Sequence, residues 1–283
     1  GLDVAVAMAR GTYSLVTPKV INVKLTGKLR PWVSAKDVIL YVLQQLSVKG
    51  GVGKIVEYTG EGVKTLSVTD RATITNMGAE LGATTSVFPS DENTKAFMES
   101  QGRGDDFVPL APDTDAVYDE VLEVNLSELE PLAAKPHSPD NVDSVKNIGP
   151  IKIDQVVIGS CTNGRMEDMR KAAAILQGHT VHPDVRVMVV PATQEVYKEC
   201  IKEGLVDIFI DAGCAFNTPS CGPCMGGHMG VMAPGEKCVS TTNRNFVGRM
   251  GDVESLIYLA SPEVAAASAI AGYIANPEKV GDK

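Results

Sequence analysis

Apolar positions in the first half of the chain alternate between strand-like and helix-like spacing. The β-branched run 20–25 predicts a buried strand. A helix is predicted to begin after Ser34, where Asp37 completes a capping box, and to end near Leu46. The same reading predicts strands over 54–58 and 84–88, a helix over 67–81 that ends before Gly82, and a helix after Asp91.

The second half repeats this alternation after a stretch rich in Gly, Asp and Pro, Gly102–Asp115, which we expect to link two units. A strand-like segment, Val117–Leu126, follows the stretch. Further strands are predicted over 155–158, 185–190, 207–210 and 237–240, and helices over 167–176, 193–202 and from Ser261-Pro262-Glu263 onward.

Strands that alternate with helices are typical of α/β proteins whose sheets are largely parallel. The sequence therefore predicts two three-layer α/β domains, the first over 1–115 and the second over 116–283. We found no internal repeat and no low-complexity tract.

Composition narrows the functional classes. Of the 283 residues, 44% are hydrophobic and 22% charged, as expected for a globular protein with a substantial core. The net charge of -9 argues against a general binder of nucleic acid or anionic membranes. There is no apolar run long enough to span a bilayer, and Gly1-Leu2-Asp3 does not open a signal peptide.

All six cysteines lie in the second half, after residue 160. A chain of this size without a secretory signal more often uses cysteine for metal binding or catalysis than for disulfides. We therefore expect a reducing compartment, the cytoplasm. Three of the thiols are expected to be small buried core residues, namely Cys200, Cys214 and Cys238.

The other three thiols follow predicted strands, where sites form in open α/β sheets. Cys161 comes directly after the strand 155–158, and Cys221 and Cys224 lie in a loop rich in Gly and Pro. Three chemistries fit them: a thioredoxin-like dithiol, a structural zinc with His228 as fourth ligand, or a [4Fe–4S] cluster with one open iron. The dithiol lacks the Trp that usually precedes such a pair, since the single Trp is Trp32.

Two further groups are candidates for a site. Arg244 and Arg249 follow another predicted strand and are suited to binding carboxylates, although exposed arginine is the simpler explanation for this segment alone. Asn76 and Glu80 share one helix face at i, i+4 spacing, which by itself suggests only a solvated pair.

Together these segments resemble the aconitase family, which includes aconitase, homoaconitase and 3-isopropylmalate dehydratase. The likeness is carried, in this order, by Ser-Cys-Thr-Asn at 160–163, Cys-Gly-Pro-Cys at 221–224, and Asn-Arg-Asn-Phe with Gly-Arg at 243–249. It extends over nearly the whole chain through the segments 25–27, 36–39, 48–51 and 76–85. The run 76–89 looks most similar to aconitase proper.

The resemblance implies a [4Fe–4S] cluster bound by Cys161, Cys221 and Cys224, whose open iron takes a substrate carboxylate and hydroxyl. It further implies an acid–base role for Glu80 and a small polycarboxylate substrate. Residues that bind this substrate or line the cluster pocket are then Asn76, Arg244, Arg249 and Asn243.

On this basis we expect a hydro-lyase of the tricarboxylic acid cycle that acts on citrate and isocitrate, with homoaconitase or a 3-isopropylmalate dehydratase large subunit as the alternative. The chain resembles only the second and third domains of the family. The missing partners are an N-terminal domain and a swivel domain or small subunit, so we expect the chain alone to be inactive. An RNA-binding regulator, as some relatives become on losing the cluster, is disfavoured by the acidic charge.

Overall fold

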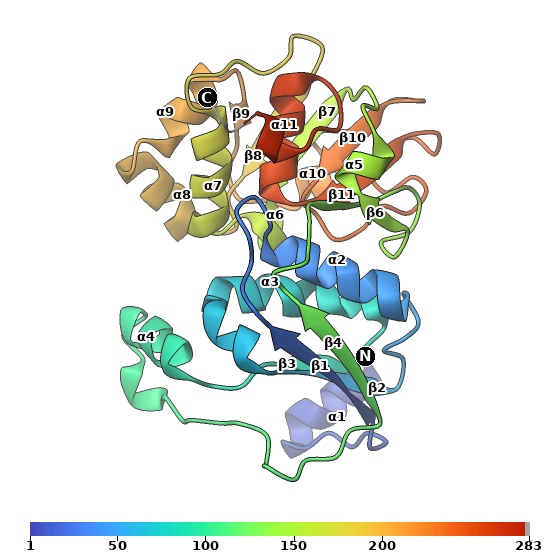
Figure 1. Cartoon of the computed structure of the whole chain (residues 1–283), viewed down its shortest axis with the longest axis vertical. Helices are drawn as coiled ribbons and strands as arrows, with labels where there is room; N and C mark the ends of the chain where they lie inside the picture. The colour runs from blue at the N-terminus through green and yellow to red at the C-terminus, as the bar shows by residue number, and fades with distance from the viewer. Residues whose placement is uncertain (281–283) are drawn as a thin grey trace.

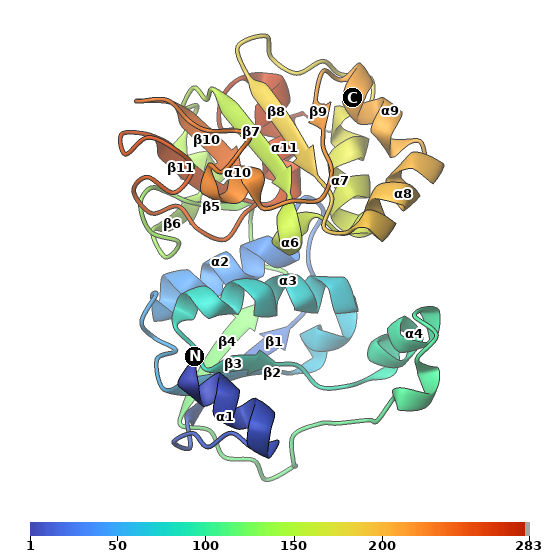
Figure 2. The ribbon, with the colours of Figure 1, turned by 180° about the vertical axis from the view of Figure 1, so that it is seen from behind.

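The computed structural model describes residues 1–280 and divides them between two β-sheets, which form the cores of a lower and an upper unit (Figure 1). Helices α2 (Ala35–Leu46) and α3 (Val68–Gly78) lie between the two sheets in both views (Figures 1 and 2). Both sheets are dominated by parallel strands, so the predicted α/β class is confirmed. No helix within residues 1–280 is long and apolar enough to cross a membrane.

The first sheet has the strand order β3-β2-β1-β4, and all its neighbours are parallel. Its strands are β1 (Lys19–Thr26), β2 (Lys54–Thr59), β3 (Thr85–Val87) and β4 (Glu120–Asn125). Alternate side chains of β1 explain how it packs: Val23 and Leu25 are fully buried, whereas Lys24 between them is exposed. The remaining helices of this half are α1 (Leu2–Arg10), α4 (Glu92–Ser100), η1 (Glu61–Thr65), η2 (Ala79–Leu81) and η3 (Gly104–Asp106).

The second sheet has the order β6-β5-β11-β10-β7-β8-β9, with antiparallel pairing only at β5 and β6 among the described strands. Its strands are β5 (Leu132–Ala134), β6 (Val142–Ser144), β7 (Gln155–Gly159), β8 (Arg186–Val190), β9 (Ala215–Phe216), β10 (Lys237–Ser240) and β11 (Leu256–Ala260). Its helices are α5 (Val145–Ile148), α6 (Ser160–Asn163), α7 (Met166–Leu176), α8 (Gln194–Lys202), α9 (Leu205–Asp211), α10 (Gly222–Met225), α11 (Pro262–Ala271) and η4 (Pro277–Lys279).

Alternate residues of β7 enter two different cores. Val156 and Ile158 pack with the α7 and α11 side chains, whereas Val157 joins the core that also holds α2 and the first sheet. The second sheet is therefore covered by its own helices on one face and by the first unit, together with loops of its own, on the other.

Two sequence-based expectations need correction. The strand predicted over Val117–Leu126 is present as β4, but it pairs with β1, so the stretch Gly102–Asp115 connects two parts of the first sheet. The expected boundary between residues 115 and 116 therefore does not separate the two sheets. The change of sheet comes between β4 and β5, and we propose it as the domain division.

The second correction concerns the strand predicted over 207–210, which is part of helix α9. Leu205 and Phe209 are its buried positions, and their i, i+4 spacing is that of a helix face. The sequence reading also missed the strands β5, β6, β9 and β11. The helices begun by Ser34, Ser67, Asp91 and Ser261 are confirmed, and each of these residues is an N-cap.

Candidate active site

The turn that carries Cys161 depends on a close approach between two strand ends. At Gly159 the backbone φ is 119°, and a Cβ atom there would lie 1.9 Å from the carbonyl oxygen of Val190. Ser160 follows with φ 75°, a left-handed conformation that is strained for a residue with a side chain. This turn ends β7 abruptly and presents Cys161 at the carboxyl edge of the sheet.

The pair Cys221 and Cys224 lies on the single-turn helix α10, which contains Pro223 in its first turn. Gly226 ends this helix with φ 59°, and a Cβ atom there would lie 2.6 Å from the backbone of Met250. The thiol loop is thereby packed against the segment that follows β10. Only a residue without a side chain allows this contact.

The three thiols face a common space. Burial raises the pKa of Cys224, and negative charge at Cys161 and Cys221 raises it further, whereas a hydrogen bond with Ser160 and the charge of Arg249 act in the opposite direction. Cys161 and Cys221 are themselves exposed. All six cysteines are free, and the three that we expected in the core are buried.

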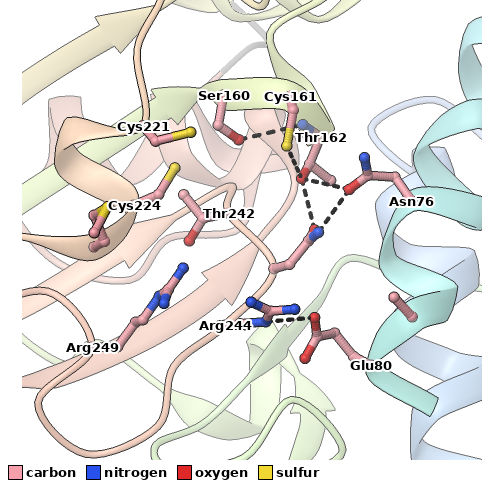
Figure 3. A pocket seen from close by; sticks show the side chains of 13 residues that line it. Asn76, Glu80, Ser160, Cys161, Thr162, Cys221, Cys224, Thr242, Arg244 and Arg249 are labelled. Carbon is pink, nitrogen blue, oxygen red and sulfur yellow. Dashed lines mark hydrogen bonds and ion pairs between the residues drawn. The ribbon is translucent and has the colours of Figure 1, made fainter. Parts of the chain in front are cut away.

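The thiols open onto a cavity of about 370 Å³ between the two units. Figure 3 shows its side chains converging from α3 and η2 on one side, and from α10 and the loops at the ends of β7 and β10 on the other. Its lining consists of Asn76, Ala79, Glu80, Ser160, Cys161, Thr162, Cys221, Cys224, Met225, Thr242, Asn243, Arg244 and Arg249.

A hydrogen-bonded group joins the two units at this cavity (Figure 3). The Asn243 amide nitrogen donates to Asn76 Oδ1 at 2.7 Å, across the junction. The Thr162 hydroxyl is 2.7 Å from Asn243 Oδ1 and 3.2 Å from Asn76 Oδ1. Its oxygen also lies 3.9 Å from the sulfur of Cys161. The amides are thus fixed beside the first thiol.

Two arginines supply the positive charge of the cavity. Arg244 Nε donates to Glu80 Oε1 at 2.8 Å, so an arginine of the second unit pairs with a carboxylate of the first. The Arg249 guanidinium lies 5.2 Å from the ring centroid of Phe246, and its buried Nε has no hydrogen-bond partner within residues 1–280. Arg249 therefore has donor capacity available for a ligand.

All eight predicted site residues line this one cavity, although they come from four separate segments of the chain. Their individual roles remain predictions. The sequence reading did not single out Ser160, Thr162, Thr242 or Met225 as site residues, although each is within two positions of a residue that it did select. Proximity in sequence to Cys161, Cys224 and Asn243 was the available signal.

The donor arrangement bears on the metal alternatives. Within residues 1–280, no group of three or more His, Cys, Asp or Glu side chains is arranged around a single ion. This gives no support to the zinc alternative with His228, although the His228 ring lies beside Gly222, between Cys221 and Cys224 in the sequence. In a cubane cluster each thiolate binds a different iron, so its ligands stand farther apart than those of one ion, and three thiols around a cavity fit that group.

Comparison with known proteins identifies the relatives of this chain. Residues 1–150 and 141–272 match the family described as Aconitase family (aconitate hydratase). The chain belongs to the aconitase family. A solved structure of Thermococcus kodakaraensis aconitase X in its holo-form covers 84% of this chain and 54% of its own, with 14% identity and a TM-score of 0.43, too low to support further inference.

Within the aconitase family, closely similar curated proteins are 3-isopropylmalate dehydratase large subunits. Those of Caldanaerobacter subterraneus subsp. tengcongensis and Thermoanaerobacter sp. are each 53% identical over 278 residues, which is 98% of this chain and 66% of the relative. The one from Clostridium kluyveri is 50% identical over the same span. The chain thus spans 66% of the length of these relatives.

These relatives change the preferred substrate. We expected citrate and isocitrate, with aconitase proper as the most similar family member and the tricarboxylic acid cycle as its setting. The relatives favour the alternative, a 3-isopropylmalate dehydratase large subunit. The motifs around the thiols and arginines carried a resemblance to the family as a whole, so they did not discriminate between its substrates.

Proposed function

We propose that this chain is the thiol-bearing part of a 3-isopropylmalate dehydratase large subunit, which removes water from a hydroxy dicarboxylate and adds it back. The observation that carries the proposal is one cavity in which three thiols face two arginines. The relatives support the reaction type through their name, since each is called a dehydratase of this substrate.

Cys161, Cys221 and Cys224 would hold a [4Fe–4S] cluster in this proposal. Such a cluster supplies, when bound, an iron without a protein thiolate that acts as a Lewis acid on the hydroxyl to be removed. The fit rests on the donor set, since three free thiols surround a cavity that also holds uncharged amides.

The arginines would bind the two carboxylates of the substrate. The Arg249 guanidinium lies over Phe246, and its buried Nε has no acceptor within residues 1–280. This nitrogen could therefore donate to a substrate carboxylate. Arg244 is half-exposed and is paired with Glu80, so a substrate carboxylate would compete with Glu80 for it. Binding would thereby free the Glu80 carboxylate.

Glu80 is the candidate acid–base group. Its side chain is 14% exposed and lies across the cavity from the loops that bear the thiols, within reach of a bound hydroxy acid (Figure 3). A freed carboxylate at this place can accept a proton in one direction of the reaction and return it in the other. Asn76 and Asn243 would orient the substrate through their amides.

The relatives are named large subunits, and we propose two partners for this chain, the N-terminal domain of the family and a swivel domain or small subunit. The absence of disulfides among the six cysteines supports a reducing compartment, the cytoplasm.

Iron uptake tests the cluster proposal. After anaerobic incubation with iron and sulfide, the wild-type chain should bind about four iron atoms and show cluster absorption. Cys161→Ser should lower iron content by roughly tenfold or more, because it removes one ligand. Cys200→Ser is the matched control, since Cys200 is buried away from the cavity. Equal iron content in wild type and Cys161→Ser would disprove the proposal.

Substrate choice is tested on the loaded chain mixed with both expected partners, the N-terminal domain and the small subunit of a 3-isopropylmalate dehydratase. Formation of the unsaturated acid from 3-isopropylmalate, followed by ultraviolet absorbance, should exceed that from citrate. Faster turnover of citrate would return the assignment to aconitase proper.

A further inference from the structure

Lys36 is a charged residue in an unusual place. It lies in the first turn of α2, its side chain is fully buried, and the helix dipole at this end is unfavourable to a cation. Burial lowers its pKa to about 7, although Asp168, Asp37 and the thiol positions Cys161 and Cys224 act to raise it. A lysine with two such costs is poorly explained by stability alone.

The ammonium of Lys36 crosses the junction between the units. Its Nζ donates to the carbonyl oxygen of Thr242 at 2.7 Å and to that of Thr241 at 3.0 Å. These carbonyls belong to the segment 241–245, which follows β10 and which we call the pocket loop. Lys36 itself does not line the cavity.

The pocket loop carries two residues of the candidate site, Asn243 and Arg244. The Thr241 hydroxyl already ties its start to Gly159, by accepting from the Gly159 N–H at 2.9 Å and donating to its carbonyl at 3.0 Å. Asn245 ties its end by donating to the carbonyl of Lys135 at 2.9 Å. Lys36 holds the stretch between these two anchors.

We propose that Lys36 is a positioning residue, whose ammonium fixes the pocket loop so that Asn243 and Arg244 face the thiols. Two carbonyls bound to one cation cannot rotate independently, so the backbone direction entering Asn243 is set by a helix of the other unit. This inference rests on the proposed function in one respect. The correct orientation of Asn243 and Arg244 matters only if these residues bind substrate.

The first test uses the chain without cluster. Lys36→Met retains side-chain length but removes the charge and the donors. Amide hydrogen exchange in the pocket loop, followed by peptide mass spectrometry, should become roughly tenfold faster, the change expected when a charged donor is lost. Unchanged exchange would overturn the proposal.

Lys171→Met is the matched control. Lys171 has a partly buried side chain, it pairs with Glu263 at 3.4 Å, and it lies on α7, which carries no residue of the pocket loop. Its pocket-loop exchange should match that of wild type. Equal acceleration in both variants would mean a general loosening of the junction and would also overturn the proposal.

Lys36→Arg provides a second variant if Lys36→Met does not fold. It keeps the charge, but its guanidinium is larger than an ammonium and holds its donors in one plane, so it does not fit the compact site between the two carbonyls without moving them. Pocket-loop exchange should again be faster than in wild type, by a smaller factor. Wild-type exchange in a folded Lys36→Arg variant would count against a positioning role.

The second test uses the cluster-loaded chain. Iron content should be the same in wild type and Lys36→Met, because the three ligands are untouched. The 3-isopropylmalate concentration that half-saturates the change in the cluster spectrum should rise about tenfold. Loss of iron in parallel with substrate affinity would point to a merely structural role and overturn the proposal. If wild type binds no cluster, the proposed function fails, while the exchange test still decides the role of Lys36.

Discussion

At the scale of single residues, burial separates the cysteines into two chemical groups. Cys161 and Cys221 are exposed at the cavity, whereas burial raises the pKa of Cys200 to about 11 and those of Cys214 and Cys238 to about 12. Because the thiolate is the reactive form, the three buried cysteines are expected to be unreactive near neutral pH.

This difference predicts an order of alkylation. With iodoacetamide at about pH 8, the folded chain should be labelled first at Cys161 and Cys221, and roughly a hundredfold more slowly at the three buried thiols. Peptide mass spectrometry measures the order, and the urea-unfolded chain is the control in which all six should react alike. Labelling of Cys238 as fast as Cys161 in the folded chain would contradict the burial of Cys238.

Most residues that line the cavity could be predicted from the sequence, and the chemistry of each residue type explains which could not. Cysteine on a Gly- and Pro-rich loop has few structural uses, so Cys221 and Cys224 stood out directly. Asn76 and Glu80 did not, because an amide and a carboxylate on a helix face have many ordinary roles. Only the resemblance selected them. Lys36 was likewise quoted only as part of a matching segment, since sequence does not reveal that a lysine is buried.

At the scale of elements, the end of β7 is the most constrained turn of the site. A side chain at Gly159 would meet the Val190 carbonyl at 1.9 Å while φ remains at 119°. Backbone atoms on the paired strand β8 cannot move aside without loss of the parallel pairing between β7 and β8.

Gly159→Ala should therefore lower the free energy of unfolding by about 3 kcal/mol or more, through combined strain and overlap. Gly178→Ala is the control, because Gly178 also has a positive φ of 75°, but a methyl group there would have no neighbour within 4 Å among residues 1–280. Its cost should be about 1 kcal/mol. Urea denaturation measures both. Equal costs would show that overlap with Val190 contributes nothing.

Helices were predicted well where an N-cap residue preceded a long stretch with helical spacing of apolar residues. Elements with only a short apolar run were predicted poorly. The helix after Ser34 has both signals, whereas the apolar positions in 205–211 suit a strand or a helix over so few residues. The three-residue strands β5 and β6 are too short to carry an alternating pattern. The sheet to which β4 belongs is decided by its pairing with β1, which lies far earlier in the chain. A local sequence pattern cannot specify such a distant partner.

At the scale of the whole molecule, α2 joins the two units. Asp37 accepts from the backbone N–H of Leu132, at the start of β5, at 2.8 Å and from that of Ser34 at 2.8 Å. Gln44 reaches the carbonyl of Val142 at 2.9 Å from the same helix. One apolar core also contains residues of both sheets. The cavity is therefore built on a packed junction.

The buried carboxyl of Asp37 should make stability depend on pH. Burial raises its pKa to about 7, against the two backbone hydrogen bonds, from an ordinary value near 3.8. A raised folded-state pKa means that the protonated form adds stability, which is fully present below about pH 3.8 and lost as pH rises through about 7. The stability advantage of wild type over Asp37→Asn should thus shrink, by on the order of 1–3 kcal/mol, between about pH 4.5 and about pH 7.5.

Urea unfolding at several pH values measures this difference. Asp143→Asn is the contrasting control, because a hydrogen bond from Asn147 holds the pKa of Asp143 below its usual range, so its stabilising contribution is lost as pH falls. The advantage of wild type over Asp143→Asn should therefore grow or stay level as pH rises. A parallel response of the two variants would exclude the assigned protonation of Asp37.

The residues that line the cavity come from separate parts of the sequence, so they are synthesised at different times. Asn76 and Glu80 leave the ribosome early, the thiols follow, and Arg249 emerges last of the lining residues. A growing chain exposes Cys161 while Cys221, Cys224 and the pocket loop, on the same side of the cavity, are still untranslated. If the chain binds the proposed cluster, iron delivered at that stage would meet an incomplete set of thiols, so loading would have to follow the synthesis of Cys221 and Cys224.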